Sequence, residues 1–254
     1  MTEVRDILPA ASASGAPDSW DSRTLRLLGP DAADVLAHAR VLVAGVGGVG
    51  GYVVEMLARS GVGHLVLVDS DTVAESNLNR QIIALRSTLG RPKVELFAAR
   101  VADINPDCRV ETLQRFLTPD NVEEILCSGF DFVADCIDTV APKVALLSAC
   151  KRLGVRVVSS MGAGGRLDPS QVCYADLWET RQDGLARAVR DSFKRRGHRP
   201  SIPVVYSPEA PRPCSLLMEQ GRDNKRSSYG TLATVPSLFG IYMASYIIRK
   251  LTGI

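Results

Sequence analysis

Hydrophobic positions along the chain fall into short apolar runs, separated by stretches in which apolar residues recur at helical spacing. The runs have the length and composition of buried strands, and they are Arg40–Ala44, Leu65–Val68, Val110–Leu113, Phe132–Cys136 and Val155–Ser159. Strands that alternate with helices form βαβ units, whose parallel strands gather in one sheet. The pattern therefore predicts an α/β fold with a Rossmann-like, mostly parallel sheet and helices on both faces.

Two segments depart from this alternation. Residues 1–20 are rich in Ala, Ser and Pro without a sustained period, which is typical of a flexible tail. Between residues 181 and 230 the periodicity weakens and five prolines cluster, so we expect a loop-rich insertion. We expect residues 21–254 to form a single domain that closes with a helix at residues 235–250.

The stretch from Ser227 to Ile248 contains no charged residue, which raises the question of a membrane span. Pro236 interrupts it, and its dense apolar part, Leu238–Ile248, covers 11 residues, whereas a bilayer crossing takes about 20. A buried helix is the favoured prediction, and weak membrane association is the alternative. The six scattered cysteines form no C-x-x-C pair and no secretion signal precedes them, which indicates reduced thiols, a cytoplasmic protein and no structural zinc.

Charge is balanced overall but not locally. The chain has 30 Lys and Arg against 28 Asp and Glu, so net charge does not mark it as a nucleic-acid binder. Within residues 181–200, seven basic residues face only Asp183 and Asp191. Two interpretations remain open: a solvated helix face, or a surface that contacts RNA phosphates. The basic residues are Arg181, Arg187, Arg190, Lys194, Arg195, Arg196 and Arg199.

A glycine-rich loop follows the first predicted strand and opens a helix. Gly45, Gly47 and Gly50 fit the pattern G-x-G-x-x-G, in which the glycines allow a tight turn, a close approach to phosphate oxygens and close packing of helix on strand. Asp69 ends the second strand, where an acid accepts hydrogen bonds from ribose hydroxyls. These features favour a nucleotide over a turn that binds nothing, but they fit NAD and ATP equally.

Basic residues further along the chain separate ATP from NAD. ATP carries more negative charge than the pyrophosphate of NAD, and its chemistry requires cations and Mg²⁺. Arg80 and Lys93 would supply those cations. Arginine offers a planar fork to phosphate oxygens and lysine a compact charge, so the pair could hold the leaving pyrophosphate as its charge develops. An NAD enzyme is therefore the weaker alternative.

A carboxylate for Mg²⁺ is expected near the same phosphates. Asp138 follows the apolar strand F-V-A-D-C-I, and ligands of open α/β sheets bind at the carboxyl ends of strands. Mg²⁺ prefers such hard oxygen ligands. Asp138 is thus the predicted metal ligand, whereas Asp135, inside the strand, could instead be a structural acid.

Four motifs together identify a family: GVGGVG, D-x-D-x-V-x-x-S-N-L-N-R-Q, R-P-K and D-x-I-D. In order and spacing they resemble the adenylation domain of ubiquitin-activating enzymes and of bacterial sulfur-carrier activators, the E1-like or ThiF–MoeB superfamily, over residues 21 to about 160. The resemblance implies that fold, with an antiparallel extension near the C-terminus. It also implies MgATP contacts from Gly45, Gly47, Gly48, Gly50, Asp69, Asp71, Ser76, Asn77, Asn79, Arg80, Lys93 and Asp138.

The same resemblance implies a homodimer and assigns catalytic roles. Arg80, Lys93 and Asp138 would act within one chain. Arg23 occupies the position of an arginine that reaches the ATP of the partner subunit in this superfamily, with Arg26 as the competing assignment. A solvated helix-surface arginine is the alternative for both.

Within the superfamily, the chain is similar to the tRNA threonylcarbamoyladenosine dehydratase branch over residues 22 to about 180. The similarity is carried by L-L-G, N-R-Q-I-x-A-L-R, I-N-P-x-C-R-V, F-L-T-P-D-N-V, D-C-I-D-T-V-x-P-K and G-A-G-G-R-L-D-P-S. It implies an ATP-dependent dehydratase that adenylates the threonyl carboxylate of the modified adenosine in the anticodon arm of a tRNA. The neighbouring carbamoyl group then closes a ring, and AMP and pyrophosphate are released.

Departures from related sequences bear on the alternatives. Sulfur-carrier activators usually carry two C-x-x-C pairs for zinc, which this chain lacks. Members of the dehydratase branch can carry a cysteine shortly before the last helix, where this chain has Ser227 and Ser228, and Cys214 is the only cysteine nearby. A thioester or persulfide step and a desulfurase partner are therefore disfavoured. Two alternatives remain: activation of the C-terminal glycine of a ubiquitin-like sulfur carrier, and a non-enzymatic nucleotide-binding scaffold.

Overall fold

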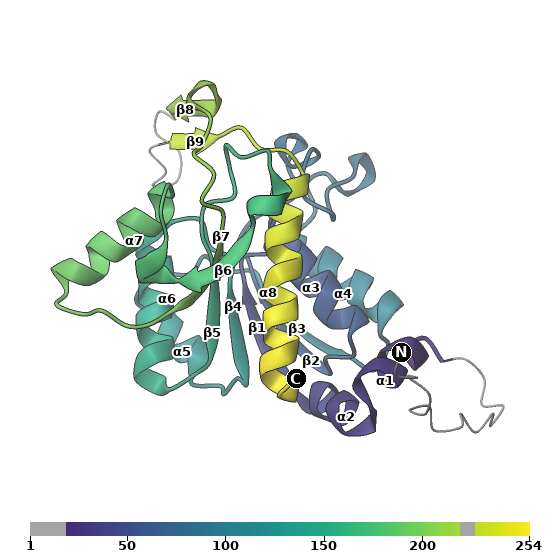
Figure 1. Cartoon of the computed structure of the whole chain (residues 1–254). Coiled ribbons are helices and arrows are strands. Elements are labelled where there is room, and N and C mark those ends of the chain that lie inside the picture. Colours follow the sequence, from purple (N-terminus) through teal and green to yellow (C-terminus); the bar gives the residue numbers. More distant parts are fainter. Residues whose placement is uncertain (1–18, 219–226) are drawn as a thin grey trace, which may run out of the picture.

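A seven-stranded sheet forms the centre of the computed structural model, which describes residues 19–218 and 227–254 (Figure 1). The strand order is β3-β2-β1-β4-β5-β7-β6, and every neighbouring pair is parallel except the antiparallel pair β6 and β7. The strands are β1 (Arg40–Ala44), β2 (His64–Val68), β3 (Arg109–Leu113), β4 (Phe132–Asp135), β5 (Val157–Ser160), β6 (Cys173–Asp176) and β7 (Pro203–Tyr206). The predicted fold class, with its antiparallel extension, is confirmed.

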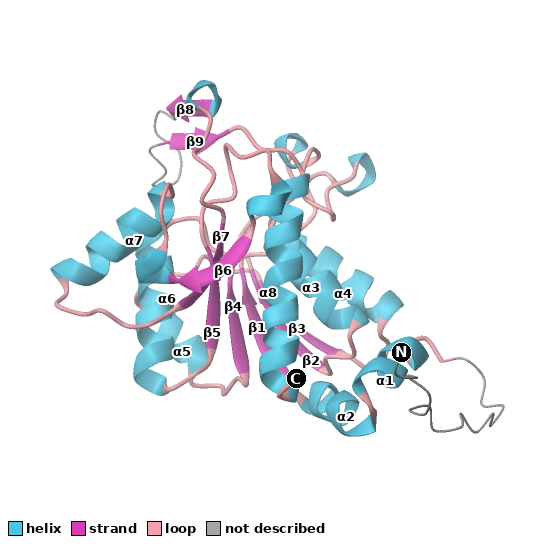
Figure 2. Cartoon of the chain, viewed as in Figure 1, coloured by secondary structure: helices cyan, strands magenta, loops and turns pink. Residues whose placement is uncertain are grey.

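Helices cover both faces of this sheet (Figure 2). Helices α3, α4 and α8 share one hydrophobic cluster, and α5, α6 and α7 share the other. The helices are α1 (Ser22–Leu28), α2 (Pro30–His38), α3 (Gly50–Arg59), α4 (Lys93–Ile104), α5 (Val122–Leu126), α6 (Val140–Leu153), α7 (Gly184–Arg195) and α8 (Thr234–Thr252). A separate antiparallel pair, β8 (Leu216–Met218) and β9 (Ser227–Tyr229), lies beyond the main sheet.

Strand β1 explains why the central runs are apolar throughout rather than alternating. Val41 and Val43 pack into the cluster on one face, while Leu42 and Ala44 pack into the cluster on the other. Side chains alternate between the two faces of a sheet, and here both faces are covered by helices. A buried parallel strand therefore has no solvent-facing position that would favour a polar residue.

The segment 181–230 contains more regular structure than the loop-rich insertion predicted for it. Helix α7 buries Ala186, Val189 and Phe193, and β7 pairs with both β5 and β6. A helix was one of two interpretations of the basic residues here, and its period is weak because its outer positions are mostly charged and only a narrow apolar stripe marks it. The predicted tail, residues 1–20, falls almost entirely outside the described residues.

Helix α8 is the closing helix expected at residues 235–250. It packs closely on α3, since a Cβ atom at Gly240 would lie 2.4 Å from the carbonyl oxygen of Val49. Its own residues Val235, Phe239 and Met243 are fully buried. Among the helices of the described part of the chain, none combines the length and the apolar character that a bilayer crossing requires.

Candidate nucleotide-binding site

The glycine loop joins β1 to α3 at the carboxyl edge of the sheet. Gly45 has a φ of 85°, in the left-handed region that favours glycine, and a Cβ atom there would lie 3.1 Å from the carbonyl oxygen of Cys136. A Cβ atom at Gly50 would lie 1.8 Å from the carbonyl oxygen of Gly45. The loop therefore closes on itself only with glycine at these positions, and it leads directly into the amino end of α3, where an anion is favoured.

Asp69 braces this loop from the end of β2. Its Oδ2 accepts a hydrogen bond from the backbone N–H of Val46 at 2.8 Å, and its Oδ1 accepts one from Asp71 N–H at 2.9 Å. Burial raises the pKa of the Asp69 carboxyl above its ordinary value, while the nearby Lys93 charge and the two backbone N–H groups oppose that rise. The acid predicted to hold ribose thus also fixes the shape of the glycine loop.

The segment after Asp71 is held by side-chain amides. Asn77 is buried, and its Oδ1 accepts a hydrogen bond from Ala74 N–H at 3.1 Å. Asn79 donates from Nδ2 to the carbonyl oxygen of Thr231 at 2.9 Å, a contact across 152 positions of sequence. These two predicted nucleotide-contacting residues therefore shape the segment that carries Arg80 and tie it to the residues just before α8.

Arg80 lies beside the glycine loop. A Cβ atom at Gly48 would lie 3.4 Å from Arg80 Cγ. The guanidinium is oriented by two hydrogen bonds, from one terminal nitrogen to the carbonyl oxygen of Ser76 at 2.8 Å and to Asn79 Oδ1 at 2.9 Å. The structure thus brings this predicted cation next to the predicted phosphate loop.

Lys93 opens α4 and is nearly buried, with 4% of its side chain exposed. Its Nζ lies 2.8 Å from Asp71 Oδ2, and its backbone N–H donates to the carbonyl oxygen of Asp71 at 3.1 Å. The Asp71 side chain is 64% exposed. The ammonium charge is therefore paired in this state, which the sequence motif alone did not reveal, and a phosphate would share or displace Asp71.

The turn after β4 adjoins the glycine loop and carries Asp138. Cys136 N–H donates to the carbonyl oxygen of Ala44 at 2.9 Å, and its own carbonyl packs against Gly45. Asp138 is exposed two residues further on. Among the described residues, no cluster of three or more His, Cys, Asp or Glu could hold a metal ion. A single exposed carboxylate suits Mg²⁺ that takes its other ligands from phosphates and water.

Asp135 has the structural role that the sequence left open for it. It is fully buried, and its Oδ2 accepts hydrogen bonds from Lys143 Nζ and from Ser159 Oγ, both at 2.6 Å. Sequence reasoning did not single out Lys143. Its signal was present, because a lysine in an otherwise apolar helix segment requires a partner when it is buried.

Arg23 does not join this group within one chain. It is exposed on α1, which packs against α2 and lies at the end of the domain where the central strands begin (Figure 1). The glycine loop and Asp138 lie at the opposite end. Arg26 is also exposed on α1, so the assignment of either arginine to a partner's site stays a prediction.

The cysteines show no activated thiol in the interior. All six fall within the described residues and none forms a disulfide. Burial raises the pKa of Cys108 to about 11 and that of Cys150 to about 12, so both thiols stay protonated at neutral pH. Cys127 and Cys214 are exposed. Cys108 and Cys150 are therefore small core residues.

Comparison with known proteins identifies the family of this chain. The ThiF family model matches residues 21–254. The chain is 38% identical over 237 residues to the tRNA threonylcarbamoyladenosine dehydratase of Bacillus subtilis, covering 91% of this chain and 93% of that one. It is 36% identical over 254 residues to the Escherichia coli enzyme of the same name, covering 92% and 95%.

The fold is similar to that of a solved structure of that enzyme. The crystal structure of E. coli tRNA N6-threonylcarbamoyladenosine dehydratase in complex with ATP superposes with a TM-score of 0.84 at 37% identity, covering 93% of this chain and 96% of that one. Because the family model spans every residue from 21 to the C-terminus and these relatives match almost end to end, this chain belongs to the ThiF family.

Proposed function

We propose that this chain is an ATP-dependent dehydratase that adenylates the carboxylate of N6-threonylcarbamoyladenosine in tRNA and cyclises it, releasing AMP and pyrophosphate. One observation carries the proposal. The glycine loop, Asp69, Arg80, Lys93 and the turn of Asp138 gather at one edge of the sheet, in a chain similar over nearly its whole length to enzymes of that name.

Each residue of the site would have its own role in the first step, the adenylation of the carboxylate. The glycine loop and the amino end of α3 would bind phosphate oxygens, and Asp69 would accept hydrogen bonds from the ribose hydroxyls. Arg80 and Lys93 would stabilise the charge that develops on the departing pyrophosphate. Mg²⁺, held by Asp138 and phosphate oxygens, would neutralise further phosphate charge.

The second step needs no protein nucleophile. The carbamoyl group lies next to the activated carboxylate in the same nucleoside, so the ring closes by an intramolecular attack that proximity favours. The product is the cyclic nucleoside, formed with net loss of water.

A homodimer would complete the site. Arg23 lies at the end of the domain opposite the nucleotide site of its own chain. Only the Arg23 of a second copy could therefore reach the nucleotide. Helices α1 and α2 expose apolar side chains, with Leu27 of α1 83% exposed and Val35 of α2 43% exposed. Such exposure is expected of a surface that a partner covers. Mixing an Arg23→Ala variant with an Asp138→Ala variant should restore activity if sites are shared, because some mixed dimers then contain one intact site.

Mass spectrometry of the tRNA nucleoside tests the proposed reaction. Incubation of tRNA bearing N6-threonylcarbamoyladenosine with the protein, ATP and Mg²⁺ should yield a nucleoside lighter by one water, and omission of ATP should prevent the change. Pyrophosphate exchange that responds to a ubiquitin-like carrier protein but not to tRNA would instead support the sulfur-carrier alternative. ATP binding without pyrophosphate release from either substrate would support the scaffold.

A further inference from the structure

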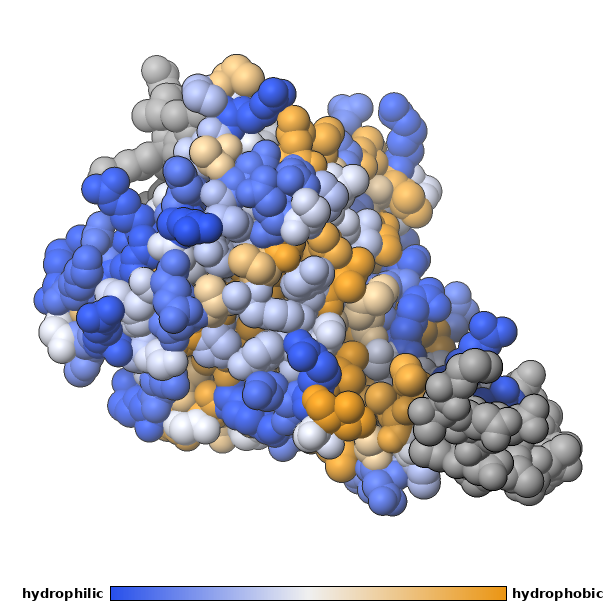
Figure 3. Space-filling view, viewed as in Figure 1, coloured by the Kyte–Doolittle hydropathy of each residue, from blue (hydrophilic) through white to orange (hydrophobic). Residues whose placement is uncertain are grey.

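The outer face of α7 and the turn after it form a basic surface on the side of the molecule away from α8. We define this α7 surface by residues 181–199. Ala186, Val189 and Phe193 face inward and are buried, and α7 packs against α6. Strongly hydrophilic side chains cover the region over α7 in the space-filling view (Figure 3). The helix is therefore held by a narrow apolar stripe and presents the rest of its circumference to solvent.

Acidic residues leave most of this positive charge unbalanced. Asp183 is buried and paired with Arg166, so it does not offset the surface. Asp191 is the remaining acid of the segment, and its contacts are long, 3.9 Å to Arg187 Nε and 3.8 Å to Lys194 Nζ. The exposed basic residues are Arg181, Arg187, Lys194, Arg195, Arg196 and Arg199.

One arginine of the segment supports the helix instead of facing solvent. Arg190 is partly buried and donates hydrogen bonds to the carbonyl oxygens of Leu177 and Thr180, each at 3.1 Å. Arg199 lies over the ring of Trp178, with 4.9 Å from its guanidinium carbon to the ring centroid. These contacts hold α7 and the following turn in place, so the basic side chains project from a fixed support.

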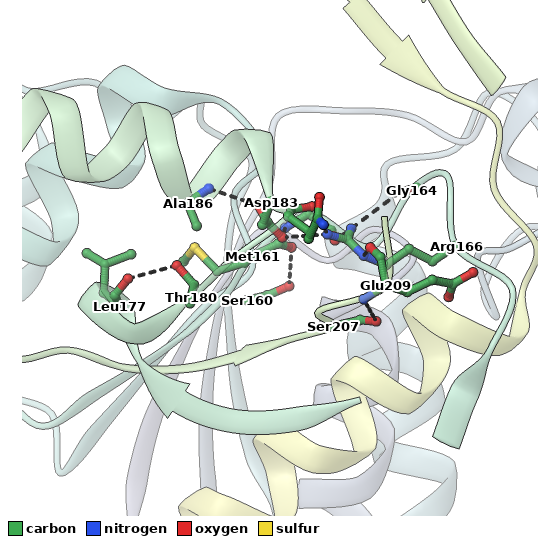
Figure 4. A network of polar contacts seen from close by, with 12 residues as sticks. Ser160, Met161, Gly164, Arg166, Leu177, Thr180, Asp183, Ala186, Ser207 and Glu209 are labelled. Carbon is green, nitrogen blue, oxygen red and sulfur yellow. Dashed lines mark hydrogen bonds and ion pairs between the residues drawn. The ribbon is translucent and has the colours of Figure 1, made fainter. Parts of the chain in front are cut away.

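A buried polar network ties the amino end of α7 to the loop after β5 (Figure 4). Asp183 caps the helix, accepting from Ala186 N–H at 2.8 Å, and its other oxygen accepts from Gly162 N–H at 3.0 Å and from an Arg166 terminal nitrogen at 3.1 Å. Arg166 is 3% exposed and also donates to the carbonyl oxygen of Gly164. The position of α7 is thus fixed relative to the carboxyl edge of the sheet, where β5 neighbours β4.

We propose that the α7 surface binds the phosphate backbone of an RNA substrate while one of its nucleosides reaches the carboxyl edge of the sheet. This inference rests on the proposed function and names the surface that it requires. The 12 residues of α7 extend over about 18 Å, so the cations at its far end stand well away from the site. That spacing suits phosphates flanking a nucleoside that is exposed in a hairpin loop, where single-stranded bases are accessible.

Binding of tRNA at several salt concentrations tests the proposal. The α7 variant carries Arg187→Gln, Arg195→Gln and Arg196→Gln. A charge-matched control carries Lys151→Gln, Arg152→Gln and Lys250→Gln. These three exposed cations lie at the carboxyl ends of α6 and α8, near the amino ends of the sheet strands. Fluorescence anisotropy with labelled tRNA should show that the α7 variant binds about tenfold more weakly at physiological salt, and that its salt slope falls by about 2, because three phosphate contacts are lost.

The control variant should keep the wild-type affinity and slope, and circular dichroism should show that both variants are folded. Equal weakening in the two variants would overturn the proposal, since it would show a response to net charge alone. Unchanged tRNA binding in the α7 variant would also overturn it. The proposal would also be overturned if the α7 variant lost carrier-stimulated pyrophosphate exchange but bound tRNA normally. That result would show that α7 binds an acidic carrier protein.

Activity measurements on the wild type and the α7 variant separate this inference from the proposed reaction. If wild-type protein dehydrates the tRNA nucleoside and the α7 variant keeps the wild-type KM for tRNA, the docking surface is wrong and the reaction stands. If wild-type protein binds tRNA through α7 but removes no water from the nucleoside, the docking surface stands and the reaction is wrong. The KM for ATP should be the same in wild type and α7 variant when the nucleoside site is intact.

Discussion

Lys143 Nζ lies 2.6 Å from Asp135 Oδ2, and both side chains are completely excluded from solvent. Ser159 Oγ bonds to the same carboxylate oxygen and lies 3.1 Å from Lys143 Nζ, which closes a triangle of polar contacts. The other oxygen, Oδ1, accepts from Ile137 N–H at 3.1 Å, one residue before Asp138. A buried ion pair thus fixes the turn that presents the predicted magnesium ligand.

Replacing Lys143 by Met should lower the free energy of unfolding by about 3–5 kcal/mol, because it leaves the Asp135 carboxylate buried without its partner. Urea denaturation measures the change. Lys151→Met, at an exposed position of the same helix, should change stability by no more than about 0.5 kcal/mol. A double variant, Asp135→Asn with Lys143→Met, should recover part of the loss because both charges are gone. Denaturation of Lys143→Met at the wild-type urea concentration would contradict this account of the pair.

Replacing Gly240 by Ala should push α8 away from α3. The added Cβ atom would lie 2.4 Å from the carbonyl oxygen of Val49 and 2.7 Å from Tyr52 Cβ, closer than these atoms can approach. Overpacking of this kind costs about 1–3 kcal/mol. Gly184→Ala, at the start of α7, is the matched control. Nothing lies within 4 Å of a Cβ atom there, so thermal denaturation should show wild-type stability or a gain of about 0.4–1 kcal/mol.

Strands β1, β2 and β4 were predictable because they are buried on both faces, so their sequences are almost entirely apolar. The run predicted at Arg40–Ala44 coincides with β1, and the other runs differ from their strands by a few residues at the ends. The glycine loop was predictable for a similar reason. Its backbone approaches itself so closely that Gly45 and Gly50 leave no room for a side chain, and this constraint is visible as a motif.

The rest of the site depends on contacts between distant segments, which no local pattern carries. The position at the strand end favoured Asp138 over Asp135 as the metal ligand, but only the structure shows that Asp135 is paired with the buried Lys143. The pairing of Lys93 with Asp71 spans 22 positions and changes how a phosphate would be received. For residues 181–200 the sequence left a solvated helix face as one of two interpretations, because the charged surface of α7 outweighs a stripe of three buried residues.

The carboxylate of Glu55 should make stability depend on pH in the acid range. Burial raises its pKa, but hydrogen bonds and charge from Arg100 and Arg59 outweigh burial and hold it below the usual 4.5. The native state therefore favours the ionised form, and the unfolded state binds more protons near that pH. This stabilisation is present above pH 4.5 and is lost as the pH falls through the native value.

Glu55→Gln should flatten the fall in stability between neutral pH and the acid range, as measured by urea denaturation at a series of pH values. Glu95→Gln, at an exposed position on the neighbouring helix α4, provides the control and should keep the wild-type profile. A profile for Glu55→Gln as steep as that of wild type would assign the acid sensitivity to other carboxylates.

Replacing Asp138 by Ala should strongly reduce Mg²⁺-dependent formation of AMP and leave the fold intact. The side chain is exposed, and the turn that carries it remains fixed by the backbone hydrogen bonds of Ile137 to Asp135 and of Cys136 to Ala44. Removing one group that stabilises charge in a transition state reduces turnover by about a hundredfold to a thousandfold. Product AMP is measured across a titration of Mg²⁺, and circular dichroism checks the fold. Asp120→Ala, which removes an exposed acid outside the site, should turn over like wild type. Wild-type turnover by Asp138→Ala at every Mg²⁺ concentration would exclude this residue as the metal ligand.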